Sequence, residues 1–216
     1  MNILLNCFKY YFYIGIFDYL FTFKVKSRYF LLHSIINGYM IYLCSSDTIN
    51  ILWNTVDYLK LYEVDNTPLC VMLSLHLYHI TPFIGFSLNY LDYLHHISSA
   101  FLGGVLLIFA NYGPLQNYNF MFVCGLPGFI DYLLLVGVKE NYIDRLTEKY
   151  YNNLLNLWIR SPFLIASVIF SWIQIQLQSE SNKYVIIIRY FCMIIQYWNA
   201  QFFLEKVVKS YWLNKN

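Results

Sequence analysis

Five histidines are the residues of this chain whose spacing could support chemistry. His76 and His79 lie three residues apart, His95 and His96 are adjacent, and His33 lies in an earlier apolar stretch. Residues three apart in a helix share one face, so His76 and His79 are expected to act together. Ionisable groups inside a membrane are costly unless they are paired, and they are candidates for a functional site. For His33 alone, a satisfied core histidine is the alternative interpretation.

Asp92 precedes the adjacent histidine pair by three and four residues. A carboxylate at this spacing could accept an Nδ1–H bond, fix the tautomer of His95 or His96 and raise its basicity, as general-base catalysis requires. The alternative is that Asp92 caps the N-terminus of a helix and has no catalytic part. The sequence leaves both interpretations open.

Metal binding is a second chemical option. A mononuclear site could use His76, His79 and either His95 or His96 as ligands. The chain has too few histidines for the larger arrays of membrane di-iron hydroxylases and desaturases. The leading expectation is therefore a site without metal or other cofactor.

Two further charged residues fall within apolar stretches, namely Asp131 in Gly125-Leu-Pro-Gly-Phe-Ile-Asp131 and Arg160 in Asn156-Leu-Trp-Ile-Arg160. Direct pairing would neutralise both charges. In the rival interpretation Arg160 lies at the lipid headgroups, with only its aliphatic stem in the apolar layer. Glycine and proline near Asp131 let a helix kink or let neighbouring helices approach closely.

The elements that must hold these residues are expected to be membrane helices. Hydrophobic residues make up 59% of the 216 residues and charged residues only 12%, about half of the charged fraction of a soluble chain. The net charge of +2 and the lack of a basic cluster argue against a nucleic-acid partner. The five cysteines have no CxxC spacing and are interpreted as small buried side chains.

Apolar stretches close to the roughly 20 residues that cross a bilayer predict six to seven spanning helices. The first stretch contains Lys9 and Asp18 and could instead lie in the membrane interface. Its lack of a basic start and a cleavage site predicts a retained helix and no cleaved signal. The predicted spans are residues 3–23, 28–44, 68–91, 96–112, 118–138, 154–178 and 184–204.

The basic residues predict how these helices are oriented. Nine lysines and arginines fall in the connections and tail on one side, whereas the opposite side has only Lys60 and Lys183. The positive-inside rule then places the N-terminus in the lumen and the C-terminus in the cytoplasm. Three regions follow: an N-terminal apolar helix (1–27), a transmembrane domain (28–204) and a cytoplasmic tail (205–216).

Several motifs in order make the chain resemble the TLC-domain family, the multi-spanning group that includes ceramide synthases. The resemblance covers about residues 28 to 175, and it looks closest to the small TLC proteins of algae and other protists. The matching segments are Arg28-Tyr-Phe-Leu-Leu-His33-Ser-Ile-Ile-Asn37, His76-Leu-Tyr-His79, Asp92-Tyr-Leu-His95-His96, Gly125-Leu-Pro127-Gly128-Phe-Ile-Asp131-Tyr132, and Glu148-Lys149 through Asn156-Leu-Trp158-Ile-Arg160-Ser-Pro162.

The resemblance implies an all-α membrane protein whose helices enclose a lipid-accessible cavity, in the endoplasmic reticulum or a related membrane. The paired histidines would face that cavity, and acyl-CoA would be the co-substrate of an acyl transfer. The rest of the extended ceramide-synthase motif is absent, so ceramide synthesis itself is not expected. A homodimer is left open.

We therefore predict a membrane protein that binds or acts on lipids, with acyl transfer as the expected reaction if it is an enzyme. The alternatives are a non-catalytic protein that binds lipid or regulates membrane composition or trafficking, and a metal-dependent lipid oxidoreductase. The predicted catalytic residues are His95, His96, Asp92 and Asp131, and the predicted substrate-binding residues are His33, Asn37, His76, His79 and Arg160.

Overall fold

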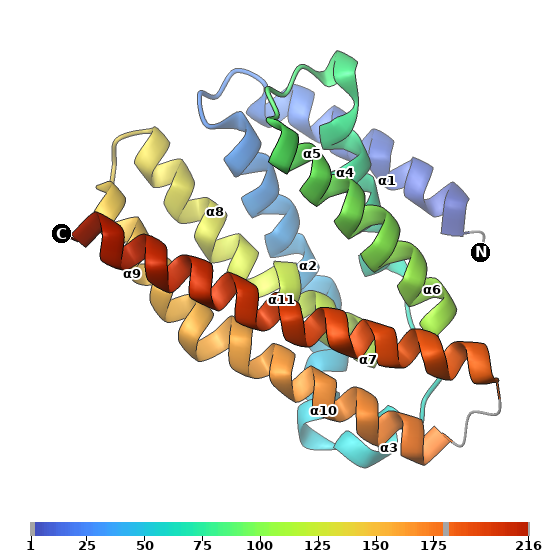
Figure 1. Cartoon of the computed structure of the whole chain (residues 1–216). Coiled ribbons are helices and arrows are strands. Elements are labelled where there is room, and N and C mark those ends of the chain that lie inside the picture. The colour runs from blue at the N-terminus through green and yellow to red at the C-terminus, as the bar shows by residue number, and fades with distance from the viewer. Residues whose placement is uncertain (1–2, 179–181, 216) are drawn as a thin grey trace.

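The computed structural model describes residues 3–178 and 182–215, and it is a bundle of helices (Figure 1). No β-strand occurs in these residues, which confirms the predicted all-α class. The elements, with π-helical or 3-10 turns marked η, are α1 (Ile3–Phe17), η1 (Asp18–Thr22), α2 (Arg28–Trp53), α3 (Thr55–Leu59), α4 (Thr67–Ile80), η2 (Pro82–Ile84), α5 (Tyr90–Ile97), η3 (Ser98–Val105), α6 (Leu106–Ala110), α7 (Leu115–Phe120), η4 (Met121–Gly125), α8 (Leu126–Lys139), α9 (Arg145–Leu155), η5 (Asn156–Arg160), α10 (Ser161–Gln178) and α11 (Lys183–Lys215).

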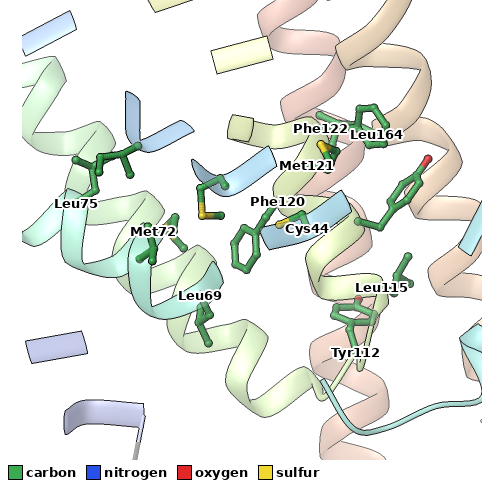
Figure 2. Close-up of a cluster of buried hydrophobic side chains, with 14 of the residues drawn as sticks. Cys44, Leu69, Met72, Leu75, Tyr112, Leu115, Phe120, Met121, Phe122 and Leu164 are labelled. Atoms are coloured by element: carbon green, nitrogen blue, oxygen red, sulfur yellow. The ribbon is translucent and has the colours of Figure 1, made fainter. Parts of the chain in front are cut away.

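Helix α2 forms the centre of the arrangement and packs against α4, α7 and α8. Helix α1 packs on the other side of α4, and α11 runs along α9, α10 and α6 (Figure 1). Buried apolar side chains from α2, α4, α7 and α10 meet in one cluster, which includes Cys44, Leu69, Phe120 and Leu164 (Figure 2). The cluster holds α4 against α2, and these helices carry three of the five histidines.

Two continuous helical stretches are long and apolar enough to cross a bilayer, Leu115–Lys139 and Arg145–Gln178. They correspond to the predicted spans 118–138 and 154–178. Helix α4 is apolar but has only 14 residues, about 21 Å at 1.5 Å per residue, shorter than the roughly 30 Å hydrocarbon layer. Two of the six to seven predicted spans therefore correspond to helices that are long and apolar enough to cross a bilayer.

The predicted continuous span over residues 68–91 is wrong, because α4 ends at Ile80. Thr81 is extended, with φ −75° and ψ 115°, the conformation that a following proline favours. Pro82 begins a short 3-10 turn, and Gly85 closes this turn with φ +82°. The chain then runs without helix until α5 begins at Tyr90. This break lets α5 fold back beside α4 and bring its histidines to those of α4.

Other helices also extend beyond the predicted spans, among them α2 and α11. Helix α2 continues past residue 44 to Trp53, so part of the predicted long loop is helical. At the other end of the chain, α11 extends through Lys215 and includes nearly all of the predicted tail. Both extensions contain many polar residues, which a search for apolar stretches excludes although they are compatible with a helix.

Candidate functional site

All five histidines come together where α2, α4 and α5 meet. His33 lies on α2, His76 and His79 on α4, and His95 and His96 on α5. Successive ring centroids are 4.3 Å apart for His33 and His79, 5.3 Å for His79 and His96, and 5.0 Å for His96 and His76. His95 continues the series, 5.9 Å from His76. We call this group the histidine cluster.

The inner half of the cluster is enclosed by protein. His33, His79 and His96 are 4%, 1% and 0% exposed. The His33 ring lies between two parallel rings, with His79 at 4.3 Å and 3° on one side and Tyr132 at 4.3 Å and 10° on the other. This part of the expected cavity is therefore filled by aromatic rings.

The hydrogen bonds of the inner half define one tautomer and leave two nitrogens without partners. His79 Nδ1 lies 2.9 Å from the Leu75 carbonyl oxygen, which can only accept, so Nδ1 carries the proton. The neutral His79 ring then has its lone pair on Nε2. Among the described residues, His79 Nε2 and His33 Nε2 are both buried without a hydrogen-bond partner. Unpaired buried polar atoms are rare and call for an explanation.

His96 connects the inner and outer halves of the cluster. Its Nε2 lies 3.1 Å from the Tyr29 hydroxyl, and its Nδ1 lies 2.8 Å from His76 Nδ1. One of these two Nδ1 atoms must carry the shared proton. If Tyr29 donates to His96 Nε2, then His96 Nδ1–H donates to His76. His96 can therefore accept on one nitrogen while it donates from the other.

The outer half of the cluster reaches the surface of the bundle. His76 is half-buried, and His95 is exposed. The His95 ring lies 5.5 Å from the ring of His96 as well as near His76. The five imidazoles thus form a continuous series from a sealed interior to a side chain that an external molecule can reach.

Asp92 has a different setting from the one that a catalytic role requires. Its carboxylate accepts the Asn89 backbone N–H at 3.0 Å, and its own backbone N–H donates to the Asn89 side chain at 3.0 Å. This reciprocal pair is a capping box at the start of α5. The capping interpretation therefore accounts for the Asp92 carboxylate.

Asp131 and Arg160 lie near each other but form no ion pair. Asp131 Oδ1 is buried without a hydrogen-bond partner among the described residues. Arg160 instead donates from Nη2 to Asn199 Oδ1 at 3.1 Å, and its guanidinium lies 4.2 Å from the centre of the Phe203 ring. Arg160 thus joins η5 to α11, a contact that neither the pairing nor the headgroup interpretation anticipated.

Asn37 lies one turn beyond His33 on α2 and is 4% exposed. It occupies the place where α2 and α8 approach most closely, because a Cβ added to Gly128 would lie 2.5 Å from Asn37 Nδ2. Ser34 strengthens the same contact by donating to the Phe129 carbonyl at 3.1 Å. The close approach places Tyr132, one turn further along α8, against His33.

Several site residues were missed by the sequence analysis. Tyr29 and Tyr132 contact the histidine rings directly, and Tyr29 is four residues before His33, on the same face of α2. Spacing could have found Tyr29. Nothing in the local sequence relates Tyr132 to His33, because they meet only through packing of α2 on α8.

A buried ion pair supports the cluster from one side. Arg28 forms an ion pair with Asp18, whose carboxylate also accepts hydrogen bonds from Thr22 and from Tyr78, the latter at 2.7 Å. Arg28 Nη1 donates to the Ile84 carbonyl at 3.1 Å. These bonds join η1, α2, α4 and η2, and they hold the turn after α4 in place.

Two surface hollows lie away from the histidines. One, of about 430 Å³, is apolar and lies between α8 and the α9–η5 stretch, where it is lined by Leu134, Leu155 and Trp158 among others. The other, of about 370 Å³, is lined by residues that include Tyr62, Asn66 and Gln116. Neither contains a histidine.

No family model, curated protein or solved structure matches this chain. The resemblance to the TLC-domain family rests on the sequence motifs quoted above.

Proposed function

We propose that this chain is an integral membrane protein of the TLC type that acts on lipids at its histidine cluster, with acyl transfer as its reaction. The observation that carries the proposal is the continuous series of five imidazoles with an accessible end at His95. The remaining support comes from the surface of the bundle and from the acid–base properties of the cluster.

The surface supports a lipid environment. Large apolar side chains are exposed along α1 and α11, including Phe12 at 64%, Ile194 at 66% and Trp198 at 58%. Contiguous apolar surface on this scale marks contact with a membrane or with another protein. Two helical stretches are long and apolar enough to cross a bilayer, which supports a membrane location. We further propose a lumenal N-terminus, a cytoplasmic C-terminus and an endoplasmic reticulum or related location.

The accessible end of the cluster is where a lipid substrate would react. An acyl transfer needs a base that takes a proton from the attacking hydroxyl or amine of the acceptor lipid as the new acyl bond forms. We assign this base to His95, which is exposed and lies beside the rings of His76 and His96. The leaving group of the donor, a thiol in the case of acyl-CoA, takes up the proton in return.

The neighbouring rings can share the proton during the reaction. His76 and His96 are joined by a 2.8 Å contact between their Nδ1 atoms, and each imidazole can bind a proton on one nitrogen while releasing one from the other. Asp92 is engaged in the capping box, so the proposal gives it no catalytic part. Asp131 Oδ1 is buried without a hydrogen-bond partner among the described residues, and the proposal gives Asp131 no catalytic part either.

Substitution of His95 tests this proposal. Membranes from cells that express the wild type, His95→Ala or the control Tyr90→Phe would be compared by lipid mass spectrometry. Tyr90 lies on the same helix and is 78% exposed. A lipid class that changes with wild type and control should return to background with His95→Ala, because a general base contributes about 10²- to 10⁴-fold in rate. The same change in that lipid class with His95→Ala would contradict His95 as the base and would favour the non-catalytic alternative, which alters lipid levels without a reaction at this residue.

A further inference from the structure

We infer that His33, His79 and His96 form a binding site for one zinc ion. Each of these buried residues offers a ring nitrogen, and the three nitrogens lie within 4.8 Å of one another. The ligands come from α2, α4 and α5, so the ion would join the three helices. This inference does not depend on the proposed acyl transfer.

The unpaired nitrogens are the main support. His79 Nδ1–H donates to the Leu75 carbonyl, so its lone pair is on Nε2, which has no partner among the described residues. A metal-binding histidine typically has its other ring nitrogen held in this way by a backbone carbonyl. His33 Nε2 is likewise buried and unpartnered. A metal ion would satisfy both nitrogens at once.

His96 can supply the third ligand without losing its other contact. When the His96 proton lies on Nδ1 and is donated to His76, the lone pair of His96 is on Nε2. This lone pair accepts a hydrogen bond only from the Tyr29 hydroxyl, at 3.1 Å. An ion would replace that hydrogen bond, and His76 would become the second partner that orients the ligand. Tyr29 would then lie beside the ion, where its hydroxyl could bind the fourth ligand.

The ligand set favours zinc over iron. The group of converging ligands consists of three imidazoles in the described part of the chain, the set that holds catalytic zinc with a fourth position open for water. Non-haem iron sites instead combine two histidines with a carboxylate. The ligand set also differs from the sequence-based alternative, because spacing within α4 and α5 suggested His76 and gave no reason to include His33.

Binding requires one of the stacked rings to rotate. A metal ion lies in the plane of each imidazole that binds it, whereas the His33 and His79 rings are parallel to within 3°. Two ligand nitrogens around a tetrahedral zinc ion are roughly 3.3 Å apart. The nitrogens of His33, His79 and His96 are separated by up to 4.8 Å, so they must move closer together. Rotation of one ring about χ2, a soft torsion, brings its lone pair toward the others. We therefore expect the stacking of His33 on His79 to be lost when zinc binds.

Cobalt titration of the full-length protein in detergent micelles tests the site. After removal of metals with a chelator, the wild type should bind one Co²⁺ per chain with visible ligand-field bands, and Zn²⁺ should displace it. The variants His33→Gln, His79→Gln and His96→Gln should each weaken binding at least about tenfold, since even the loss of a residue that hydrogen-bonds a metal ligand costs 10- to 100-fold in affinity. The control His95→Ala removes an imidazole of the same cluster and should bind Co²⁺ like the wild type.

Two outcomes would overturn the site: no saturable Co²⁺ binding by the wild type, or full affinity in the three glutamine variants. X-ray absorption of the zinc-bound wild type keeps the inference testable if a variant fails to fold. Scattering from three imidazoles is expected, and a zinc shell of sulfur or of oxygen alone would contradict it. His95→Ala separates the two proposals, because it should lose the lipid product and keep the metal.

Discussion

The histidine cluster and the site of Arg189 are both buried groups of polar atoms, but their side chains make different contacts. Arg189 is 0% exposed and donates to the Ala110 and Asn111 carbonyls at 2.7 and 2.6 Å. These carbonyls end α6, where a helix leaves acceptors unpaired and where a positive charge is favourable. In the histidine cluster, the Nε2 atoms of His33 and His79 have no hydrogen-bond partner among the described residues, and ring nitrogens of His33, His79 and His96 converge on one another.

The difference indicates what each site contributes. The Arg189 contacts close the end of α6 onto α11, so they stabilise the fold. The unpartnered Nε2 atoms of His33 and His79 cost free energy when they are buried, and nothing offsets this cost until something binds to them. Such an arrangement is typical of functional sites, where local stability is given up for reactivity or binding.

The largest effect should come from Arg189→Leu. The variant leaves the carbonyl of the buried residue Ala110 without its donor, whereas Asn111 is exposed and its carbonyl can bind water instead. A buried unsatisfied group costs about 1–3 kcal/mol. We expect a loss of about 1–3 kcal/mol in the free energy of unfolding, measured by denaturation in detergent micelles. Tyr112→Phe is the control, because it removes a single hydrogen bond to the Arg189 carbonyl at 3.0 Å and should cost about 1 kcal/mol. Equal losses would contradict the role given to the guanidinium.

A smaller effect is expected from Asp92→Ala, which tests whether the Asp92 carboxylate stabilises the fold or takes part in the reaction. Loss of the capping box should reduce stability by about 1 kcal/mol, while the lipid product attributed to His95 should remain. A capping role thus predicts a change in melting temperature with little change in turnover. A loss of product as large as that of His95→Ala would instead restore Asp92 to the catalytic group.

Much of the fold could be predicted from the sequence, because a low charged fraction and long apolar stretches predict membrane helices. The helical class and the stretches around Leu115–Lys139 and Arg145–Gln178 follow from composition and length. The break after Ile80 was missed, although Pro82 gives a local reason for it. Polar helical ends, such as the last turns of α2 and α11, could not be found by a search for apolar residues.

The site was predictable in its residue types and less so in its arrangement. The five histidines were identified because they lie in apolar segments, but spacing relates only residues on the same helix. The stacking of His33 on His79, and of Tyr132 on His33, depends on how α2 packs against α4 and α8. Arg189 was overlooked, although an arginine inside a predicted span is itself a signal.

The stability of His79→Leu measured beside Arg189→Leu tests the central claim most directly. Leucine removes the unpaired Nε2 and the Nδ1–H bond to Leu75, a carbonyl that also accepts from the backbone of α4 in its regular i to i−4 pattern. If the cluster is kept for function, His79→Leu should change the free energy of unfolding by less than about 1 kcal/mol and should abolish Co²⁺ binding. A destabilisation as large as that of Arg189→Leu would show that the histidines serve the fold, and it would contradict the account.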